Sequence, residues 1–508
     1  TVAKTDRYVN TWDGELYLEM HRGTFTTKSN LKKANRTLEF KLRETELRAA
    51  LSSLTGTSYP SEELTECYKK FLLNQFHDIL PGSHIHPVYE DAMNDYRSVS
   101  ERLDAMLALT AGNEYFNSLN FTRSSITFIE DENGAITRHG VKGFWSIPTL
   151  AGLSTGTVAA LPSKENWLST EFCDKCDCLV VETPYYRAKL SSDGSFVSLY
   201  DKELDREWVK EGCGFNKLHL YADNPGVYDA WDILPNYKDV QVALNVDKPL
   251  ALVSSDGSSA EFAVTFTTEK STWKMILRFF ADSRAIEVEN VVDWDEKHKL
   301  VKVNFGPDVL TRELVCDTSA GFVKRDLTKN TSWQQARFEV CHHKWCDMSE
   351  SGSGIAIINE GKYGVGLEKD EISLSLLRAT IRPDITSDIG HHDFCYTILP
   401  HSGDAVEAQV NKTAMEYNVP LCKSNVTVPA ALRDTLNNCG LYLQAMKRSE
   451  DGQFLILRLS EQDGRRGKIA FPFEVQTMNL IEDIEGSTKV VSYHPFELIT
   501  VAVKPEDL

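Results

Sequence analysis

A histidine and a carboxylate lie side by side where an amphipathic run ends. His77 and Asp78 follow apolar residues that recur at steps of three and four, so a helix should end close to His77, and Pro81 and Gly82 then stop it. An imidazole that packing fixes on one side and leaves open on the other can bind a metal or a polar ligand. Asp78 could orient that imidazole or accept a hydrogen bond from a ligand hydroxyl. A helix cap or a surface rim position is the alternative role for both residues.

A second group of candidate residues lies near the start of the chain. Asp13 and Glu15 precede the run from residue 16 to 20, and Glu19 lies within it; the pattern of this run is typical of a short strand. Strand alternation would put the three acids on one side and the two leucines of the run on the other. An isolated strand is not stable in water, so this run needs a sheet partner. Solvation of a surface edge is the alternative role of the acids.

The residues from about 29 to 112 predict three helices that would position His77. Ser29 can cap the first helix, Pro60 and Ser61 open the second, and Pro87 opens the third. Their apolar stripes are typical of core packing, and connections this short make neighbouring helices antiparallel. We therefore expect a helical bundle that carries His77 at the end of its middle helix.

From about Tyr115 onward the pattern changes to strands. Alternating or β-branched runs, such as residues 286–292, are separated by Ser, Asp and Gly turns, and residues 191–195 form a hairpin signal. Over this distance the pattern predicts β-sandwiches, with breaks near residues 115, 190 and 420.

Length and charge limit the possible partners. The 508 residues exceed one ordinary domain, and 42% hydrophobic with 25% charged residues is typical of a globular chain with several cores. The formal net charge of -19 argues against nucleic acid or an anionic membrane as partner, because both need a basic face. The charge is compatible with a neutral substrate such as a sugar.

The eleven cysteines are an odd number spread over the chain, which does not indicate a disulfide framework. Cys173, Cys176 and Cys178 form the one tight cluster, and no second pair follows at zinc-ribbon distance, so a cysteine-bearing loop is favoured over a metal site. We expect a reducing, cytoplasmic location, with a vacuole or lysosome-like compartment as the alternative.

Two motifs carry a family resemblance. The first motif (residues 12–27, WDGELYLEMHRGTFTT) is followed about fifty residues later by the second motif (residues 74–83, NQFHDILPGS). In order and separation they resemble glycoside hydrolase family 38, the retaining α-mannosidases, and within it the branch of cytosolic, vacuolar and bacterial enzymes. The resemblance implies that His77 is a ligand of the catalytic zinc, or of another divalent cation in its place.

The resemblance also implies that the chain is the carboxy-terminal part of such an enzyme. In the family the first motif closes a large amino-terminal α/β domain, which carries the other zinc ligands and the nucleophile. The expected fold class is therefore multidomain α+β, consisting of the edge of an α/β catalytic domain, a three-helix bundle and all-β sandwich domains. The expected domains are the end of the catalytic domain (1–28), the bundle (29–114), a small β domain (115–189), a large β-sandwich (190–420) and a carboxy-terminal β-sandwich (421–508).

The implied reaction is the removal of α-linked mannose from oligosaccharides or glycoproteins with retention. Retention needs two carboxyl groups about 5 Å apart, one as nucleophile and one as proton donor. The nucleophile would come from the missing amino-terminal half, so this chain alone should be inactive. For the proton donor we select Glu15, because the Gly-Glu-Leu core of the first motif aligns best with the family's acidic residue. Glu19 is the second choice and Asp13 the third.

Further residues resemble family stretches near the site. Asp388 and His392 lie in such a stretch and could bond sugar hydroxyls, with buried structural roles as the alternative. Expected partners are a mannose-containing oligosaccharide and the missing half, with a homo-oligomer left open, but neither nucleic acid nor membrane. Two other classes remain open: a carbohydrate-binding or scaffolding module, and a metal-binding protein with a site built from His77, His84 and His86.

Overall fold

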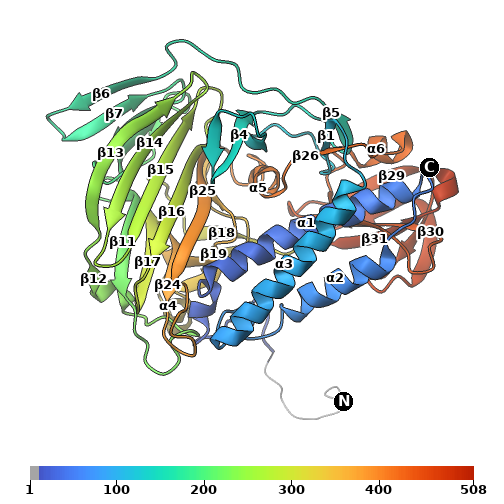
Figure 1. Ribbon diagram of the computed structural model, residues 1–508, viewed down its shortest axis with the longest axis horizontal. Helices are drawn as coiled ribbons and strands as arrows, with labels where there is room; N and C mark the ends of the chain where they lie inside the picture. Colours follow the sequence, from blue (N-terminus) through green and yellow to red (C-terminus); the bar gives the residue numbers. More distant parts are fainter. Residues whose placement is uncertain (1–10) are drawn as a thin grey trace.

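Three long helices cross one face of the molecule (Figure 1). The computed structural model describes residues 11–508. Each helix begins at or beside its predicted start, and Pro87 occupies the first turn of the third. Their apolar stripes meet in one core that includes Leu42, Leu64 and Leu103, so the predicted three-helix bundle is confirmed. Within residues 11–508, no helix is both long and apolar enough to cross a bilayer. The helices are α1 (Ser29–Ser53), α2 (Ser61–Leu73) and α3 (His86–Ala108).

Helix α1 joins the bundle to the β domains. Leu47 and Leu51 of α1 share a hydrophobic core with the carboxy-terminal sheet. The guanidinium group of Arg43 donates hydrogen bonds to the backbone carbonyls of Ser118 at 3.0 Å and Leu443 at 2.9 Å. These contacts bury α1 on most of its sides, including many of its charged residues.

Glu46 of α1 is one of these buried charged residues, and it makes the stability of the chain depend on pH. Burial raises the pKa of Glu46 to about 7, against hydrogen bonding by the Tyr68 hydroxyl at 3.1 Å. The folded chain holds this proton more tightly than the unfolded chain, so stability should fall as the pH rises from about 4 to about 7. Glu46→Gln should therefore stabilise the chain by up to about 3 kcal/mol at pH 8 and by little at pH 4.

Urea unfolding of the Glu46→Gln variant at both pH values measures this difference. Glu66→Gln, at an exposed position on α2, is the control and should change stability little at either pH. Equal stabilities of the Glu46→Gln variant and the parent chain at pH 8 would contradict the expectation.

Two large sheets pack face to face around the main core, to which both contribute buried apolar residues. The first has the order β20 (Glu339–Cys341), β23 (Gly364–Glu368), β24 (Glu371–Ala379), β17 (Lys299–Phe305), β11 (Phe215–Ala222), β9 (Phe196–Asp201), β8 (Tyr186–Leu190), β7 (Cys178–Glu182) and β6 (Ser169–Cys173), with β10 (Arg206–Glu207) and β12 (Gln241–Val242) beside it. The second has the order β13 (Asn245–Ser255), β14 (Ser259–Thr267), β15 (Thr272–Phe280), β16 (Ile286–Trp294), β25 (Gly390–Ser402), β22 (Ser353–Asn359), β21 (Trp345–Glu350), β18 (Glu313–Thr318) and β19 (Gly321–Asp326). The pairings given for these strands are antiparallel, as expected for a sandwich.

The first sheet corrects one predicted boundary. Strands β6, β7 and β8 were assigned by the sequence to a separate small domain that ends at residue 189, but they pair into the large sandwich. The sandwich therefore begins at Ser169, the first residue of β6. Short strands such as β6 and β7 are stable only when they pair with neighbouring strands of a larger sheet. Cys176 and Cys178 form a disulfide in the turn between β6 and β7.

Two small sheets connect the helices to the sandwich. One joins segments far apart in the sequence, since β1 pairs with β26 and not only with its near neighbour β5. The other lies against the upper part of the second large sheet (Figure 1). Their orders are β26 (Cys422–Ser424), β1 (Glu114–Asn117), β5 (Ser154–Gly156), and β2 (Thr127–Glu130), β4 (Val141–Ser146), β3 (Ile136–Arg138).

A five-stranded sheet ends the chain and packs on α1. Its order is β27 (Tyr442–Arg448), β28 (Leu455–Ser460), β31 (Leu498–Val503), β29 (Gly467–Met478) and β30 (Ile484–Tyr493). Short helices complete the structure: η2 (Arg22–Phe25), η3 (Tyr237–Asp239), α4 (Ser332–Ala336), α5 (Val410–Asn418), α6 (Ala430–Leu436) and η4 (Pro505–Asp507).

Two local predictions near the candidate residues are wrong. Residues 16–20 form no strand but an irregular segment that ends in a turn, and Leu16 is 81% exposed and Leu18 67% exposed. Without a sheet partner among residues 11–508, strand hydrogen bonds cannot form there. The second helix ends at Leu73, and residues 74–81 continue in turns with Asp78 in the left-handed region at φ 67°. His77 therefore lies on a loop that follows the helix.

Candidate active site

The two motifs meet in one pocket. Its volume is about 840 Å³, and its wall combines the first motif, the loop after α2 and the edge of the sandwich. The polar side chains that line it include Glu15, His21, His77, Asp78, Trp231 and Arg325. Residues separated by some sixty positions in the sequence thus face a common cavity of a size that suits a sugar ligand.

Arg22 and Gly23 hold the first motif in place. The Arg22 guanidinium donates to both carboxylate oxygens of Asp232, at 3.0 and 3.3 Å. The Gly23 backbone N–H donates to the Trp231 carbonyl at 2.8 Å, and a Cβ atom at Gly23 would overlap the Arg378 guanidinium. Glycine is therefore required at this position, where two segments of the chain approach each other closely.

His77 is accessible from the pocket. Its ring is exposed and lies 4.1 Å, between centroids, from the ring of Phe76. An exposed imidazole that is restrained on one face can offer a ring nitrogen to a metal ion. His84 and His86, the alternative ligands, do not line this pocket: the Nδ1 atom of His84 lies 3.1 Å from the Ile85 carbonyl, and that of His86 lies 3.1 Å from Asp384.

Asp78 is oriented by two donors on one oxygen. The indole Nε1–H of Trp231 donates to Oδ1 at 3.0 Å, and the Ser83 hydroxyl donates to the same atom at 2.7 Å. As far as residues 11–508 extend, Oδ2 is left for a ligand, so the carboxylate can accept a hydroxyl hydrogen or join a metal site. Whether it contacts substrate stays a prediction.

Glu15 forms a two-pronged ion pair with Arg325. The guanidinium Nε and Nη2 donate to the two carboxylate oxygens at 3.0 and 2.7 Å. This hydrogen bonding lowers the pKa of Glu15, against the opposing effect of partial burial. A proton donor needs a raised pKa. In this arrangement Glu15 is an ionised carboxylate, and proton donation requires that Arg325 releases it.

The other two candidate acids, Glu19 and Asp13, are exposed, and neither lines the pocket. Asp13 is followed by Gly14 in the left-handed region at φ 117°, so the chain bends between Asp13 and Glu15. The predicted alternation of the three acids does not apply, since the segment is not a strand. Their catalytic roles stay predictions.

The structure places Asp388 and His392 away from the pocket wall. Both are buried, and the Asp388 carboxylate accepts the backbone N–H groups of Lys28 and Ser29, each at 2.7 Å. His392 Nε2–H donates to the Asp388 carbonyl at 2.7 Å. The Asp388 carboxylate therefore caps the start of α1, and His392 supports the loop that carries Asp388. These contacts replace the predicted hydrogen bonds to sugar hydroxyls.

Asp388→Ala should destabilise the chain by about 1–3 kcal/mol, because two buried N–H groups at the start of α1 lose their acceptor. Urea unfolding measures the loss. Asp293→Ala is the control, because it removes an exposed carboxylate on β16. It should lower the free energy of unfolding by less than about 0.5 kcal/mol. An Asp388→Ala variant as stable as the control would contradict the capping role.

Two site residues escaped the sequence analysis. Trp231 lies outside both motifs, between β11 and β12, and Arg325 lies on β19 with no local signal of function. Both reach the pocket through tertiary contacts, with Asp78 and Glu15 respectively. In the sequence, an arginine on a strand that faces a pocket looks the same as one that faces solvent.

Comparison with known proteins gives the family. The chain matches the description "Glycosyl hydrolases family 38 C-terminal domain" over residues 181–386, "Alpha mannosidase middle domain" over residues 19–112 and "Glycosyl hydrolases family 38 C-terminal beta sandwich domain" over residues 440–501. The chain belongs to glycoside hydrolase family 38. Its matched middle domain contains His77, Asp78 and most of the first motif.

Relatives in this family are named as mannosidases. The chain is 30% identical over 481 residues to "Alpha-mannosidase 2C1" of Homo sapiens. The aligned region covers 89% of this chain and 46% of the human protein. It is 31% identical over 432 residues to "Alpha-mannosidase" of Saccharomyces cerevisiae, covering 80% of the chain and 37% of the yeast protein. The chain thus spans less than half the length of these relatives.

Solved structures show the same fold. An α-mannosidase from Enterococcus faecalis matches with a TM-score of 0.74 at 12% identity, over 96% of this chain and 68% of the other. A family 38 protein from the same organism matches with a TM-score of 0.70 at 13% identity, over 95% and 71%. The multidomain α+β arrangement of bundle and sandwiches is therefore that of this family.

Proposed function

We propose that this chain forms one wall of the active site of a retaining α-mannosidase, and that an amino-terminal half supplies the nucleophile and the remaining metal ligands. The observation that carries the proposal is the convergence of the two motifs on one pocket, with His77, Asp78 and Glu15 on its wall. Membership of family 38 and relatives named as α-mannosidases support the substrate class.

The residues present fit a divalent metal such as zinc. His77 offers an exposed imidazole at the pocket, and the oriented Asp78 carboxylate stands next to it in the chain. When bound, such a metal would supply Lewis-acid contacts to hydroxyls of the mannose ring. Within this chain, His77 would hold the ion, and Asp78 would accept a hydroxyl hydrogen through its free oxygen. Trp231 and Ser83 keep that carboxylate fixed, which reduces the entropy lost on binding.

Glu15 is the proposed proton donor, and Arg325 is its proposed regulator. The ion pair keeps the carboxylate ionised, so the acid form would be populated only when substrate or the amino-terminal half separates the two side chains. In the retaining mechanism the same group first protonates the departing oxygen and later, as carboxylate, accepts a proton from water. Because Arg325 favours the ionised form of Glu15, it suits the step in which Glu15 accepts a proton from water.

Exposed apolar residues lie at the pocket and in the segment that leads to His77. Leu16 and Leu18, which line the pocket, are 81% and 67% exposed, and Leu72, Leu73 and Phe76, just before His77 in the chain, are 59–60% exposed. Side chains of this size gathered at a cavity rim are typical of a surface that another domain covers. We infer that the amino-terminal half packs here and closes the pocket.

The proposed location is a reducing, cytoplasm-like compartment. Among residues 11–508, nine cysteines are free, several of them fully buried, and the other two form the short-range disulfide Cys176–Cys178. Buried thiols without partners are compatible with a compartment that does not promote disulfides.

Enzyme assay of the chain mixed with the amino-terminal half tests the proposal. The mixture should hydrolyse an aryl α-mannoside with retention, should lose activity with a chelator, and should leave an aryl β-mannoside intact. A carbohydrate-binding or scaffolding module would instead bind mannose oligosaccharides with the same affinity in zinc and in chelator. That outcome, with no hydrolysis by the mixture, would overturn the proposal.

A further inference from the structure

A second group of side chains that could hold a metal ion lies outside this pocket. His139 in the turn between β3 and β4, Glu360 just after β22 and Cys395 on β25 place one ligand atom each within 4.8 Å of the others. His139 Nε2 is 3.2 Å from Glu360 Oε2 and 3.2 Å from Cys395 Sγ. Three segments that are distant in the sequence thus bring an imidazole, a carboxylate and a thiol together.

The two separations from Nε2, both 3.2 Å, come within a few tenths of an ångström of those in a tetrahedral site. Zinc binds nitrogen and oxygen at about 2.0–2.2 Å and sulfur at about 2.3 Å, so neighbouring ligand atoms of a tetrahedral site lie roughly 3.3–3.6 Å apart. Hydrogen bonding accounts for the arrangement less well. One hydrogen on Nε2 can serve both short contacts only as a three-centre bond, whereas a shared metal ion would give each ligand atom a bond of its own.

The other nitrogen of His139 supports the same assignment. Among residues 11–508, its Nδ1 atom is buried without a hydrogen-bond partner, although Asp393 Oδ2 lies 3.3 Å away and Glu289 Oε1 lies 3.5 Å away. Two carboxylates beside Nδ1 favour the tautomer with its hydrogen there. Nε2 then keeps its lone pair, as in metal sites where a carboxylate orients the histidine ligand.

The charge around the cluster also leaves room for a cation. Four carboxylates face three basic side chains and the His139 imidazole in this ion-paired network, so with a neutral imidazole one negative charge is in surplus. The carboxylates belong to Glu287, Glu289, Glu360 and Asp393, and the basic groups to Arg138, Arg278 and Lys33. A divalent cation bound by a thiolate adds one net positive charge and balances the surplus.

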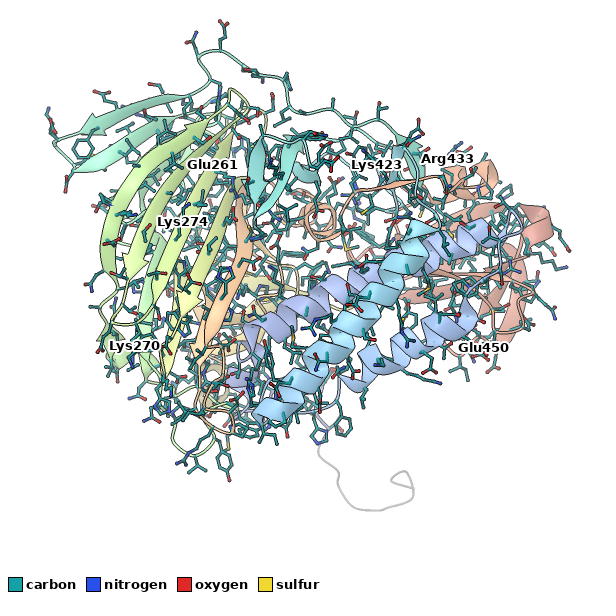
Figure 2. The ribbon with its side chains drawn as sticks, viewed as in Figure 1. Glu261, Lys270, Lys274, Lys423, Arg433 and Glu450 are labelled. Carbon is teal, nitrogen blue, oxygen red and sulfur yellow. A yellow bond between two sulfur atoms is a disulfide. The ribbon has the colours of Figure 1, made fainter. Side chains whose placement is uncertain are left out.

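One more acid borders the network. Glu261 on β14 pairs with Arg278 on β15, and it is labelled in Figure 2. Its side chain is 19% exposed, against 33% for Asp393 and 16% or less for the other three carboxylates. If its charge is counted as well, the surplus of negative charge grows and a cation is favoured further.

An ion can reach the cluster. His139 and Glu360 border a second pocket of about 650 Å³, which opens between α1 and the small sheet of β2, β3 and β4. Glu360 uses Oε1 for Arg138, while its Oε2 accepts the Cys395 backbone N–H at 3.3 Å and lies 3.2 Å from His139 Nε2. The pocket provides both an approach and the space for a water molecule as a fourth ligand.

We propose that His139, Glu360 and Cys395 form a structural site for a divalent cation of the zinc class, distinct from the His77 pocket. The thiol loses its proton to solvent when the cation binds, and the metal–sulfur bond replaces the sulfur–hydrogen bond. The bound ion links the small sheet to β22 and β25 of the sandwich. Because the three ligands come from separate segments, binding should stabilise the folded chain.

Metal binding by the purified full chain tests this site with Zn²⁺ and Co²⁺ as probes. The chain should retain zinc after dialysis, and its cobalt form should show a thiolate-to-cobalt charge-transfer band. Cys395→Ala and His139→Ala should each weaken binding at least about 10-fold, abolish the band and remove the rise in Tm on zinc addition. Cys346→Ala, at a buried free cysteine on β21 of the same sheet, is the matched control and should retain all three.

The His77→Ala variant separates this site from the active-site metal. It should keep the thiolate band and the gain in Tm, whatever its effect on mannosidase activity. A cobalt form of the parent chain without a thiolate band would overturn the proposed site, and this readout does not depend on how any variant folds. Zinc binding that survives Cys395→Ala unchanged would overturn it as well.

Discussion

His77→Ala, assayed in the presence of the amino-terminal half, should lower kcat/KM for an aryl α-mannoside by at least about 100-fold. Loss of residues that merely support metal ligands already costs about 10–100-fold in metal affinity or activity, and a direct ligand should matter more. The exposed ring borders the pocket, so its removal should not disturb the core. Metal analysis of the purified assembly should show a parallel loss of zinc from the active site.

His391→Ala is the control for this prediction. His391 is exposed on β25 and contacts Asp293 at the surface, so its removal should leave both activity and zinc content unchanged. Excess zinc should partly restore the activity of His77→Ala if the defect is weaker metal binding. Normal activity of His77→Ala with normal zinc content would remove His77 from the site.

Glu15→Gln should lower kcat/KM by about 10²–10⁴-fold if Glu15 donates the proton, the range that general acid catalysis contributes. The loss should be larger for a poor leaving group than for a good one, because only the poor one needs protonation. Glu19→Gln is the matched control, since Glu19 is exposed in the same motif and does not line the pocket. Equal activity of Glu15→Gln and Glu19→Gln would contradict the assignment.

Arg325→Gln tests the ion pair. Hydrogen bonding by Arg325 lowers the pKa of Glu15, so its removal should move that pKa upward, toward the ordinary value. The protonated fraction of Glu15 at a given pH should then increase. The descending limb of the pH profile of kcat/KM, which reports the enzyme before substrate binds, should shift to higher pH. An unshifted limb would show that Glu15 is not the group that limits activity.

The helical part of the fold could be predicted because its signals are local. Ser29, Pro60 and Pro87 stand at or beside the starts of the three helices, and apolar spacing gives their buried faces. The end of α2 was misplaced because the apolar spacing continues through Phe76, although that side chain is 59% exposed. A residue that another domain would cover resembles a core residue in the sequence.

The site could be predicted only in part. Resemblance located His77 and Glu15, and the structure brings both to one pocket. Asp388 carries the same chemistry as a sugar-binding acid, but its carboxylate caps α1, a contact across some 360 residues that no local pattern encodes. Arg325 likewise acquires its partner only through folding. Charge type can be read from the sequence, whereas the partner of a charge depends on tertiary structure.

Anomalous diffraction at the zinc edge, from crystals of this chain assembled with the amino-terminal half, tests the central claim most directly. The account predicts a zinc peak in the pocket between the two motifs, about 2.1 Å from a ring nitrogen of His77. A pocket zinc that lies beyond coordination distance of His77, or a fully active assembly with no zinc there, would contradict it.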